Sequence, residues 1–444
     1  MTKICELYET EKEKKHEDLT VAKHVALTGD YWTSVSNSNY LGVTAHLITA
    51  AWELKSFALR VMKTEEHHFA EACAEHFLIV TREWEIEEKI TTVGTDGARN
   101  MTAAAKILPF EHMLCVAHIL QRCVTVSLGD SGFVSALSKR RKIVGHIKHS
   151  PANTLELEAQ QATLGQWKEP LIQDVPTRWN STLEMINRLN RNQAAIKATL
   201  DQQSHKLVML TPQEWDKLQK LESLLEPGKY VTEILGGESY VSCSVVLPAF
   251  CHLRHVMETS GDDPAYVSKF KTAFQEDLTS RQERFVDNEW LKIATALDPR
   301  FKDLKCLPKS DRERVWTTLG QLLHEQSPPR QSFEDKPPKK KGLLQMGSDS
   351  ESDEELLPDR LMHLYRAEPT ISIENCPLEW WSAHWRAHEK LALLACKYLT
   401  TLATTVPCER LFSVAGNIVN KKRSSLLSDN VNKLVCLNSW LKKE

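Results

Sequence analysis

The sequence predicts an α/β fold in which a mixed sheet is interrupted by a large all-helical insertion and followed by a helical C-terminal region. Two patterns carry this prediction. Early segments alternate apolar and polar residues as strands do, whereas spacing of three to four dominates from about residue 126 to 325. At 444 residues, the chain can hold two or three structural units.

The first part of the chain predicts a small sheet. Residues 25–34 form a short apolar run that ends near Asp30, as a buried strand does. Residues 40–49 and 54–62 alternate apolar and polar side chains, as half-buried strands do. A helix is expected over residues 69–84, before a fourth strand that ends at Asp96. Three antiparallel strands and a crossover helix place the fourth strand parallel to the first. We therefore expect Asp30 and Asp96 on neighbouring strands, whose backbones are about 5 Å apart.

The remaining elements are predicted with less detail. A helix is expected over 100–107, a fifth strand and a helix within 112–124, and helices over 188–200, 214–225 and 377–398. Pro407 begins a helix that carries Glu409. The predicted units are a flexible segment 1–21, the first part of the core 22–125, the helical insertion 126–325, a disordered basic and acidic loop 326–358, and a return to the core in 359–444.

Composition excludes several classes of protein. The formal net charge is −3, so any contact with nucleic acid must come from local clusters of basic residues. The 11 cysteines include no C-x-x-C pair, which favours reduced thiols inside the cell. No signal peptide and no apolar run of roughly 20 residues is evident, so we expect no membrane association. Nothing indicates a small-molecule substrate.

Three acids are candidates for a metal site. Phosphodiester chemistry with hard cations requires carboxylate oxygens that converge, so that two Mg²⁺ ions roughly 4 Å apart can hold the attacking and leaving oxygens. Asp30, Asp96 and Glu409 are ligands of this type. Each also has an ordinary explanation, since Asp30 and Asp96 can close turns and Glu409 can favour the start of a helix.

A series of motifs gives these acids a joint context. It resembles hAT-superfamily DNA transposases, closest to the BED zinc-finger proteins derived from them. The resemblance covers about residues 22–441, and its motifs are DYWTS, TDGARNM, CVAH, PTRWNS, LDPRFK, PLEWWSAHW and CERLFSVAGNIVNKKR. It implies an RNase H-like core, a helical insertion and a C-terminal dimerisation region. It also implies that relatives carry an N-terminal BED finger. This sequence starts just before the first core strand, so we expect that the finger is truncated or lost.

The resemblance assigns roles by position. Asp30, Asp96 and Glu409 become the catalytic and metal-binding triad, with Mg²⁺ or Mn²⁺ as the cofactor. Gly29 replaces a commoner threonine and is expected to loosen the strand, and Cys408 replaces a common serine. His118 is placed near the site, in contact with phosphate or a catalytic water.

Cys115 and His118 form a C-x-x-H pair. Zinc normally takes four ligands, and no second half-site lies at finger spacing nearby. We therefore expect a core thiol with a hydrogen-bonded histidine and no zinc in this chain.

Nucleic-acid contacts are expected from aromatic and basic residues. Trp32 and Trp179 are implied to stack on unpaired bases, which is worth roughly 1–3 kcal/mol, although core packing explains either equally well. Arg178 is a candidate phosphate partner. A basic cluster can track the DNA backbone or simply form a charged helix face: Lys139, Arg140, Arg141 and Lys142. Two further basic runs lie at 336–341, where nuclear import is expected, and at 421–423. Serines 348, 350 and 352 lie among acids, where phosphorylation is expected.

The C-terminal region holds more apolar surface than a lone helix pair can bury. The resemblance implies a homodimer formed here, and burial against the sheet is the competing explanation. The residues expected at the dimer interface are Trp380, Trp381, Trp385, Leu411, Phe412, Val431 and Leu434.

Three functions remain open. The first is a domesticated nuclear protein that binds DNA or chromatin partners as a dimer, and the sequence favours it because the finger is missing and Gly29 is altered. The second is an active Mg²⁺-dependent transposase, which the intact acids favour. The third is a dimerising scaffold without a nucleic-acid role.

Overall fold

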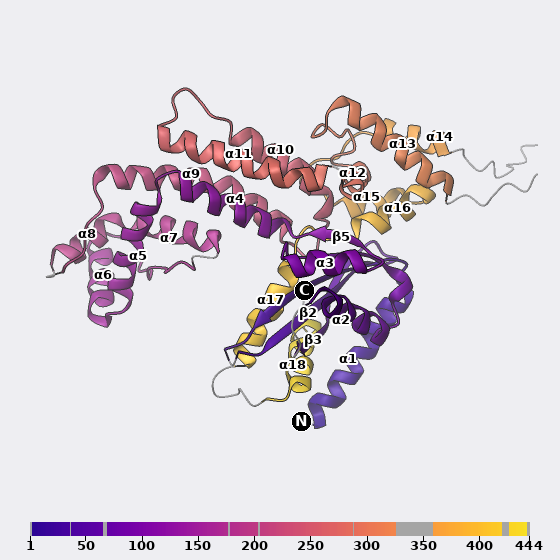
Figure 1. Cartoon of the computed structure of the whole chain (residues 1–444), viewed down its shortest axis with the longest axis horizontal. Helices are drawn as coiled ribbons and strands as arrows, with labels where there is room; N and C mark the ends of the chain where they lie inside the picture. Colours follow the sequence, from indigo (N-terminus) through magenta and orange to yellow (C-terminus); the bar gives the residue numbers. More distant parts are fainter. Residues whose placement is uncertain are drawn as a thin grey trace, which may run out of the picture.

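The protein is described from a computed structural model, which covers residues 2–35, 37–64, 69–175, 178–202, 205–286, 288–325, 358–419 and 426–441. A five-stranded mixed sheet has the order β3-β2-β1-β4-β5. The chain leaves this sheet for a long helical region and returns to it near the C-terminus (Figure 1). The predicted α/β class, the mixed sheet and the large helical insertion are confirmed.

The sheet is formed by β1 (Val25–Thr33), β2 (Asn39–Ile48), β3 (Leu54–Thr64), β4 (Ile90–Thr95) and β5 (Glu111–Leu114). The helices of the first part are α1 (Thr2–Val21), α2 (Ala70–Glu83), α3 (Arg99–Ile107) and α4 (Val116–Asp130), with a 3-10 turn at Glu87–Lys89. The helical region comprises α5 (Val134–Lys148), α6 (Pro151–Thr163), α7 (Trp179–Arg191), α8 (Gln193–Asp201), α9 (Pro212–Leu235), α10 (Val246–Val256), α11 (Ala265–Val286), α12 (Glu289–Ala296) and α13 (Lys309–Glu325), with a 3-10 turn at Cys243–Val245. The last helices are α14 (Pro358–Ala367), α15 (Pro377–His384), α16 (Glu389–Leu399), α17 (Val406–Ile418) and α18 (Ser428–Trp440).

The strand register sets two acids at the same level. β1 pairs antiparallel with β2 and parallel with β4, where Thr28 lies opposite Gly94. Asp30 and Asp96 each lie two residues further along, Asp30 within β1 and Asp96 directly after β4. The predicted meander, the parallel fourth strand and the neighbouring positions of these two acids are therefore confirmed.

The N-terminal segment differs from the prediction. Residues 1–21 were expected to be flexible, yet Thr2–Val21 form α1. Tyr8 stacks on Trp440 of α18 with ring centroids 5.0 Å apart, and Leu19 is fully buried. Lys12 also pairs with Glu83 at 2.8 Å. The sequence of this segment is polar, and it gave no sign of an ordered helix because the residues that hold α1 in place lie far along the chain.

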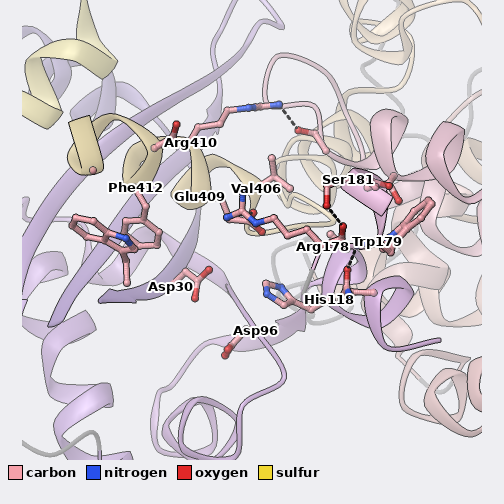
Figure 2. A pocket seen from close by; sticks show the side chains of 18 of the residues that line it. Asp30, Asp96, His118, Arg178, Trp179, Ser181, Val406, Glu409, Arg410 and Phe412 are labelled. Atoms are coloured by element: carbon pink, nitrogen blue, oxygen red, sulfur yellow. Dashed lines mark hydrogen bonds and ion pairs between the residues drawn. The ribbon is translucent and has the colours of Figure 1, made fainter. Parts of the chain in front are cut away.

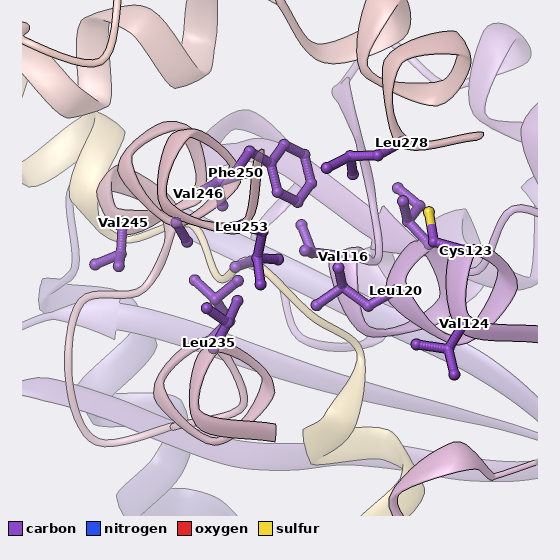
Figure 3. Packing of buried hydrophobic residues seen from close by; sticks show 14 of the residues in the cluster. Val116, Leu120, Cys123, Val124, Leu235, Val245, Val246, Phe250, Leu253 and Leu278 are labelled. Atoms are coloured by element: carbon purple, nitrogen blue, oxygen red, sulfur yellow. The ribbon is translucent and has the colours of Figure 1, made fainter. Parts of the chain in front are cut away.

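The buried residues of the helical region belong to a core that also includes Ile48, Leu54 and Met113 of the sheet and residues of α15 and α16. Figure 3 shows Val116 and Leu120 of α4 packed against Leu235 of α9 and against Phe250 and Leu253 of α10, and all five are buried. These helices extend away from the sheet (Figure 1).

One predicted helix in this region, 188–200, is divided into α7 and α8. The break falls at Asn192, whose side-chain amide donates to the Arg188 carbonyl and to Glu169. Local hydrogen bonds of this kind compete with helix continuation.

The C-terminal helices return to the sheet. α17 lies against β1 and β2, and α18 covers the edge strand β3. Ser439 and Asn432 of α18 accept hydrogen bonds from the backbone of Ala58 and Val61, and the Trp440 indole donates to the Ala58 carbonyl. Side chains of α18 thus take up hydrogen bonds of backbone groups along the edge strand β3, which protects this edge from pairing with other chains.

One predicted span in this region divides. Residues 377–398 form α15 and α16, separated around the buried His388, which lies beside the rings of Tyr365 and Trp380. The predicted disordered loop, its basic and serine-rich runs at 336–341 and 348–352, and the basic run 421–423 lie outside the described residues.

Candidate active site

Four predicted site residues reach one pocket from four parts of the chain. Asp30 lies near the end of β1, Asp96 directly follows β4, His118 lies in the first turn of α4, and Glu409 lies in the first turn of α17 (Figure 2). All four line a cavity of about 1170 Å³. The return of Glu409 to the sheet, which the resemblance alone implied, is present in the structure.

Three of these residues form the tightest group. One ligand atom each from Asp30, His118 and Glu409 lie within 4.8 Å of one another. Asp96 lines the same cavity but does not belong to this group. Its carboxylate accepts a hydrogen bond from the Ala98 amide at 3.2 Å, the turn-forming role that the sequence left open.

The pocket crowds negative charge. Burial, together with the nearby Asp96 and Glu409 carboxylates, raises the pKa of Asp30 to about 7 against the opposing effects of His118 and of the Tyr31 amide. The Cys115 sulfur and then the Asp30 and Glu409 carboxylates raise the pKa of His118 to about 10, while burial opposes this. A bound cation would relieve the same repulsion. The two carboxylates fit a divalent ion, and His118 can add an imidazole nitrogen once the ion displaces its second ring proton.

Cys115 lies beside this group. Its thiol is buried, and its sulfur accepts a hydrogen bond from the Thr405 amide at 3.2 Å. The Val116 amide also donates to the Ala403 carbonyl at 3.0 Å. These bonds join the start of α4 to the segment that leads into α17, which brings His118 close to Glu409.

Gly29 does not loosen β1. It pairs with Val43 without a break in register. A Cβ at this position would lie 2.3 Å from the ring of Phe77, a fully buried residue of α2. The aromatic ring therefore fills the space of the missing side chain, and glycine is required by packing directly beside Asp30.

We predict that Gly29→Ala lowers the free energy of unfolding by about 1–3 kcal/mol, because the added methyl group overpacks against Phe77. Gly97→Ala is the matched control, since a Cβ at Gly97 meets nothing within 4 Å. Urea unfolding of both variants measures the difference. Equal losses in the two variants would show that the Phe77 ring moves aside freely.

Trp32 keeps a place in the pocket. It lines the cavity and stacks on Phe412 of α17 with centroids 6.0 Å apart. Gly42 makes room for this arrangement, because a Cβ there would lie 2.8 Å from the Phe412 ring. Trp32 is half-buried, so part of the indole faces the cavity.

Arg178 and Trp179 have different surroundings. The Arg178 side chain is 70% exposed, lines the cavity and lies 4.0 Å from the Glu409 carboxylate. Trp179 is only 4% exposed and packs against Gly228 of α9. Trp179 also borders the cavity (Figure 2), but with so little of it exposed the structure favours the packing explanation over stacking on a base.

The predicted basic cluster on α5 serves mainly internal contacts. Arg140 is fully buried, and Lys139 and Arg141 pair with Glu214 and Asp174, each at 2.7 Å. Lys142 is exposed. Three of the four cations therefore hold α5 within the helical region, which favours the alternative that the sequence left open, an ordinary charged helix face.

The residues predicted at a dimer interface lie largely inside the chain. Trp381, Leu411, Phe412 and Val431 are buried, which is the competing explanation that the sequence left open. Trp380 and Leu434 are half-buried, and Trp385 is 39% exposed.

Gln121 and Arg410 are among the pocket residues that the sequence interpretation missed. Gln121 lies one turn after His118 on α4, and its side-chain oxygen accepts the Trp179 amide hydrogen at 2.8 Å. Arg410 follows Glu409 and pairs with Glu238 at 3.2 Å. Helical spacing of three from His118, and direct adjacency to Glu409, were the signals that could have found them.

Comparison with known proteins decides the family. Three family models match in chain order: the ZBED1 RNase-like domain over residues 28–122, the ZBED1 RNase-like helical domain over 113–224, and the hAT family C-terminal dimerisation region over 361–441. The chain therefore carries a hAT-family dimerisation region together with ZBED1-type RNase-like domains. The recognition made from its motifs is confirmed.

Curated relatives agree with the hAT assignment. The chain is 26% identical to a putative AC transposase of Zea mays, with 99% of this chain and 59% of the relative aligned. It is 24% identical to the putative transcriptional regulator tpeD of Talaromyces stipitatus, over 97% of this chain and 55% of the relative. It is 21% identical to the human zinc finger BED domain-containing protein 4, over 93% and 37%. The chain thus spans about three fifths of the transposase it matches.

Among the described helices, none combines the length and apolar character needed to cross a bilayer.

Proposed function

We propose that this hAT-superfamily chain carries a divalent-metal site that cleaves and rejoins DNA strands. The observation that carries the proposal is the convergence of Asp30, His118 and Glu409 within 4.8 Å. The structure changes the balance drawn from the sequence, because Gly29, which counted against activity, is packed tightly against Phe77.

The chemistry divides between the ion and the side chains. Bound Mg²⁺ or Mn²⁺ would activate the attacking oxygen and stabilise the leaving oxygen. Asp30 and Glu409 would hold it through carboxylate oxygens, with Asp96 at the adjacent strand end. His118 can orient water in the same cavity. Trp32 offers the exposed part of its indole to a base that has left the duplex.

Purified chain with Mg²⁺ or Mn²⁺ should nick supercoiled DNA, and Asp96→Asn should reduce the rate to background. Chelation with EDTA should have the same effect on the wild-type chain. Failure of the wild type to nick with either ion would remove the enzyme function.

Arg178 is proposed as a phosphate contact. Its exposed guanidinium lines the cavity and already lies beside a carboxylate, so a phosphate oxygen can replace that partner. We predict that Arg178→Gln lowers the slope of log affinity against log salt by about one unit for DNA. Lys142→Gln removes the same charge from α5 and should leave the slope unchanged. A loss confined to Lys142→Gln would restore the helix cluster as the DNA contact.

A homodimer is proposed from the matched hAT dimerisation region and from the exposed Trp385 within it. Light scattering at micromolar concentration should give about twice the chain mass of 50.6 kDa. A mass of one chain at that concentration would contradict the dimer.

We place the protein in the nucleus because relatives are named as a transcriptional regulator and BED zinc-finger proteins.

The second candidate is the domesticated DNA-binding or chromatin-binding protein without cleavage. The position of Asp96 outside the tightest group favours it, as does the regulator tpeD among the relatives. Under this candidate, DNA binding persists with no metal-dependent nicking. The scaffold without a nucleic-acid role predicts neither.

A further inference from the structure

A line of buried polar side chains lies between α17 and the sheet, next to the site. We call it the polar relay. Its residues are Thr28 on β1, Thr44 and His46 on β2, Ser56 on β3 and Cys408 on α17. Thr28, Thr44, His46 and Cys408 are each no more than 2% exposed. Side chains alternate along a strand, so Thr28 shares its face of the sheet with Asp30.

The hydrogen bonds of the polar relay have a defined direction at one end. The Ser56 hydroxyl donates to the Glu238 carbonyl at 2.7 Å, so its oxygen accepts from His46 Nδ1 at 2.8 Å. Burial lowers the pKa of His46 to about 3, so at neutral pH the ring holds a single proton, on Nδ1. Nε2 then accepts from one threonine hydroxyl, either Thr44 at 3.0 Å or Thr28 at 3.2 Å, and the other hydroxyl can donate to the oxygen of its neighbouring threonine.

The other end reaches the helix of Glu409. The Cys408 sulfur lies 3.4 Å from both the hydroxyl and the carbonyl oxygen of Thr28, and either can accept the thiol proton. Thr28 and Thr44 each contact the other, His46 and Cys408, and we call Thr28 the hub because its hydroxyl lies closer to the sulfur, at 3.4 Å against 3.8 Å for Thr44.

A second tether closes a ring around Glu409. Arg410 pairs with the Glu238 carboxylate at 3.2 Å and donates to the Gly236 carbonyl at 3.0 Å. The polar relay ends on the Glu238 carbonyl. Glu409 therefore lies between two residues, Cys408 and Arg410, that are both tied to the same loop after α9.

The start of α17 depends on such tethers. Its N-cap residue, Thr405, makes no side-chain capping bond, and its buried hydroxyl has no partner among the described residues. A helix start without a cap is held less firmly. The Thr405 amide bond to Cys115 fixes the segment before the helix, whereas the polar relay fixes its first turn to β1.

We propose that the polar relay is a positioning unit that holds the first turn of α17 against β1, so that the Glu409 and Asp30 carboxylates stay within bridging range of one ion. The role given to the polar relay rests on the proposed metal site, whereas its hydrogen bonds are seen in the structure itself. Hydrogen-bonded groups behind metal ligands commonly change metal affinity by about 10–100-fold when they are removed.

The test removes the hub hydroxyl and keeps its shape. In Thr28→Val, hydrogen exchange at the Cys408 and Glu409 amides should accelerate about tenfold, and Thr28→Ser should restore the wild-type rate. Thr92→Val is the matched control. Thr92 is equally buried on the adjacent strand, and it bonds the Thr401 hydroxyl outside the polar relay.

Calorimetric titration with Mn²⁺ gives the second readout. Thr28→Val should bind Mn²⁺ about tenfold more weakly than the wild type, whereas Thr28→Ser and Thr92→Val should bind within about twofold of it. Equal behaviour of Thr28→Val and Thr92→Val in both experiments overturns the proposal. A wild-type chain that binds no Mn²⁺ refutes the proposed function instead, and hydrogen exchange alone then decides whether the polar relay positions α17.

Discussion

Glu409→Gln should reduce metal-dependent nicking of supercoiled DNA by about 10³-fold or more. The substitution keeps the size of the side chain but removes the charge that complements a divalent ion. The ion supplies several kcal/mol of transition-state stabilisation, and each 1.36 kcal/mol is tenfold in rate. Initial rates on supercoiled plasmid with Mn²⁺ measure the effect.

Glu233→Gln is the matched control, since Glu233 lines the same cavity but does not belong to the group of converging ligands. It should keep the wild-type rate within about threefold. Equal losses in both variants would mean that the cavity only needs negative charge, and unchanged nicking in Glu409→Gln would remove this residue from the site.

The second large effect concerns stability. Trp381→Ala should lower the free energy of unfolding by about 3–5 kcal/mol. The indole is fully buried, stacks between Trp52 and Tyr365 with centroids 6.0 and 5.4 Å away, and donates to the Leu297 carbonyl at 2.9 Å. Its loss leaves a cavity and an unpaired carbonyl. Urea unfolding measures the change.

Trp385→Ala is the comparison, because this neighbouring tryptophan is 39% exposed. It should cost less than about 1 kcal/mol. Should Trp381→Ala instead keep its stability and lose only self-association in light scattering, the side chain would belong to a dimer interface as the sequence first suggested.

Local pattern was sufficient where a residue's environment is set by its neighbours in the chain. Alternation identified the strands, and the helix after the third strand made the fourth parallel to the first. These two facts place Asp30 and Asp96 at the same level. The same reasoning could not recover α1, because its order depends on Tyr8 stacking against Trp440 at the far end of the chain.

The candidate site was predicted unevenly for a related reason. The acids were recognised by motif, but Glu409 reaches Asp30 only through packing of α17 on the sheet. Charge alone misled at Arg140, which is buried and donates to Asn190 and to the Ile186 carbonyl. Aromatic character alone misled at Trp179, which fills space above Gly228. Partners distant in sequence decide both cases.

Anomalous scattering from crystals soaked in Mn²⁺ tests the shared pocket most directly. A peak about 2.1 Å from carboxylate oxygens of both Asp30 and Glu409 is the predicted result. An occupied site elsewhere, or no peak in this cavity at millimolar Mn²⁺, would contradict a metal-dependent function for this chain.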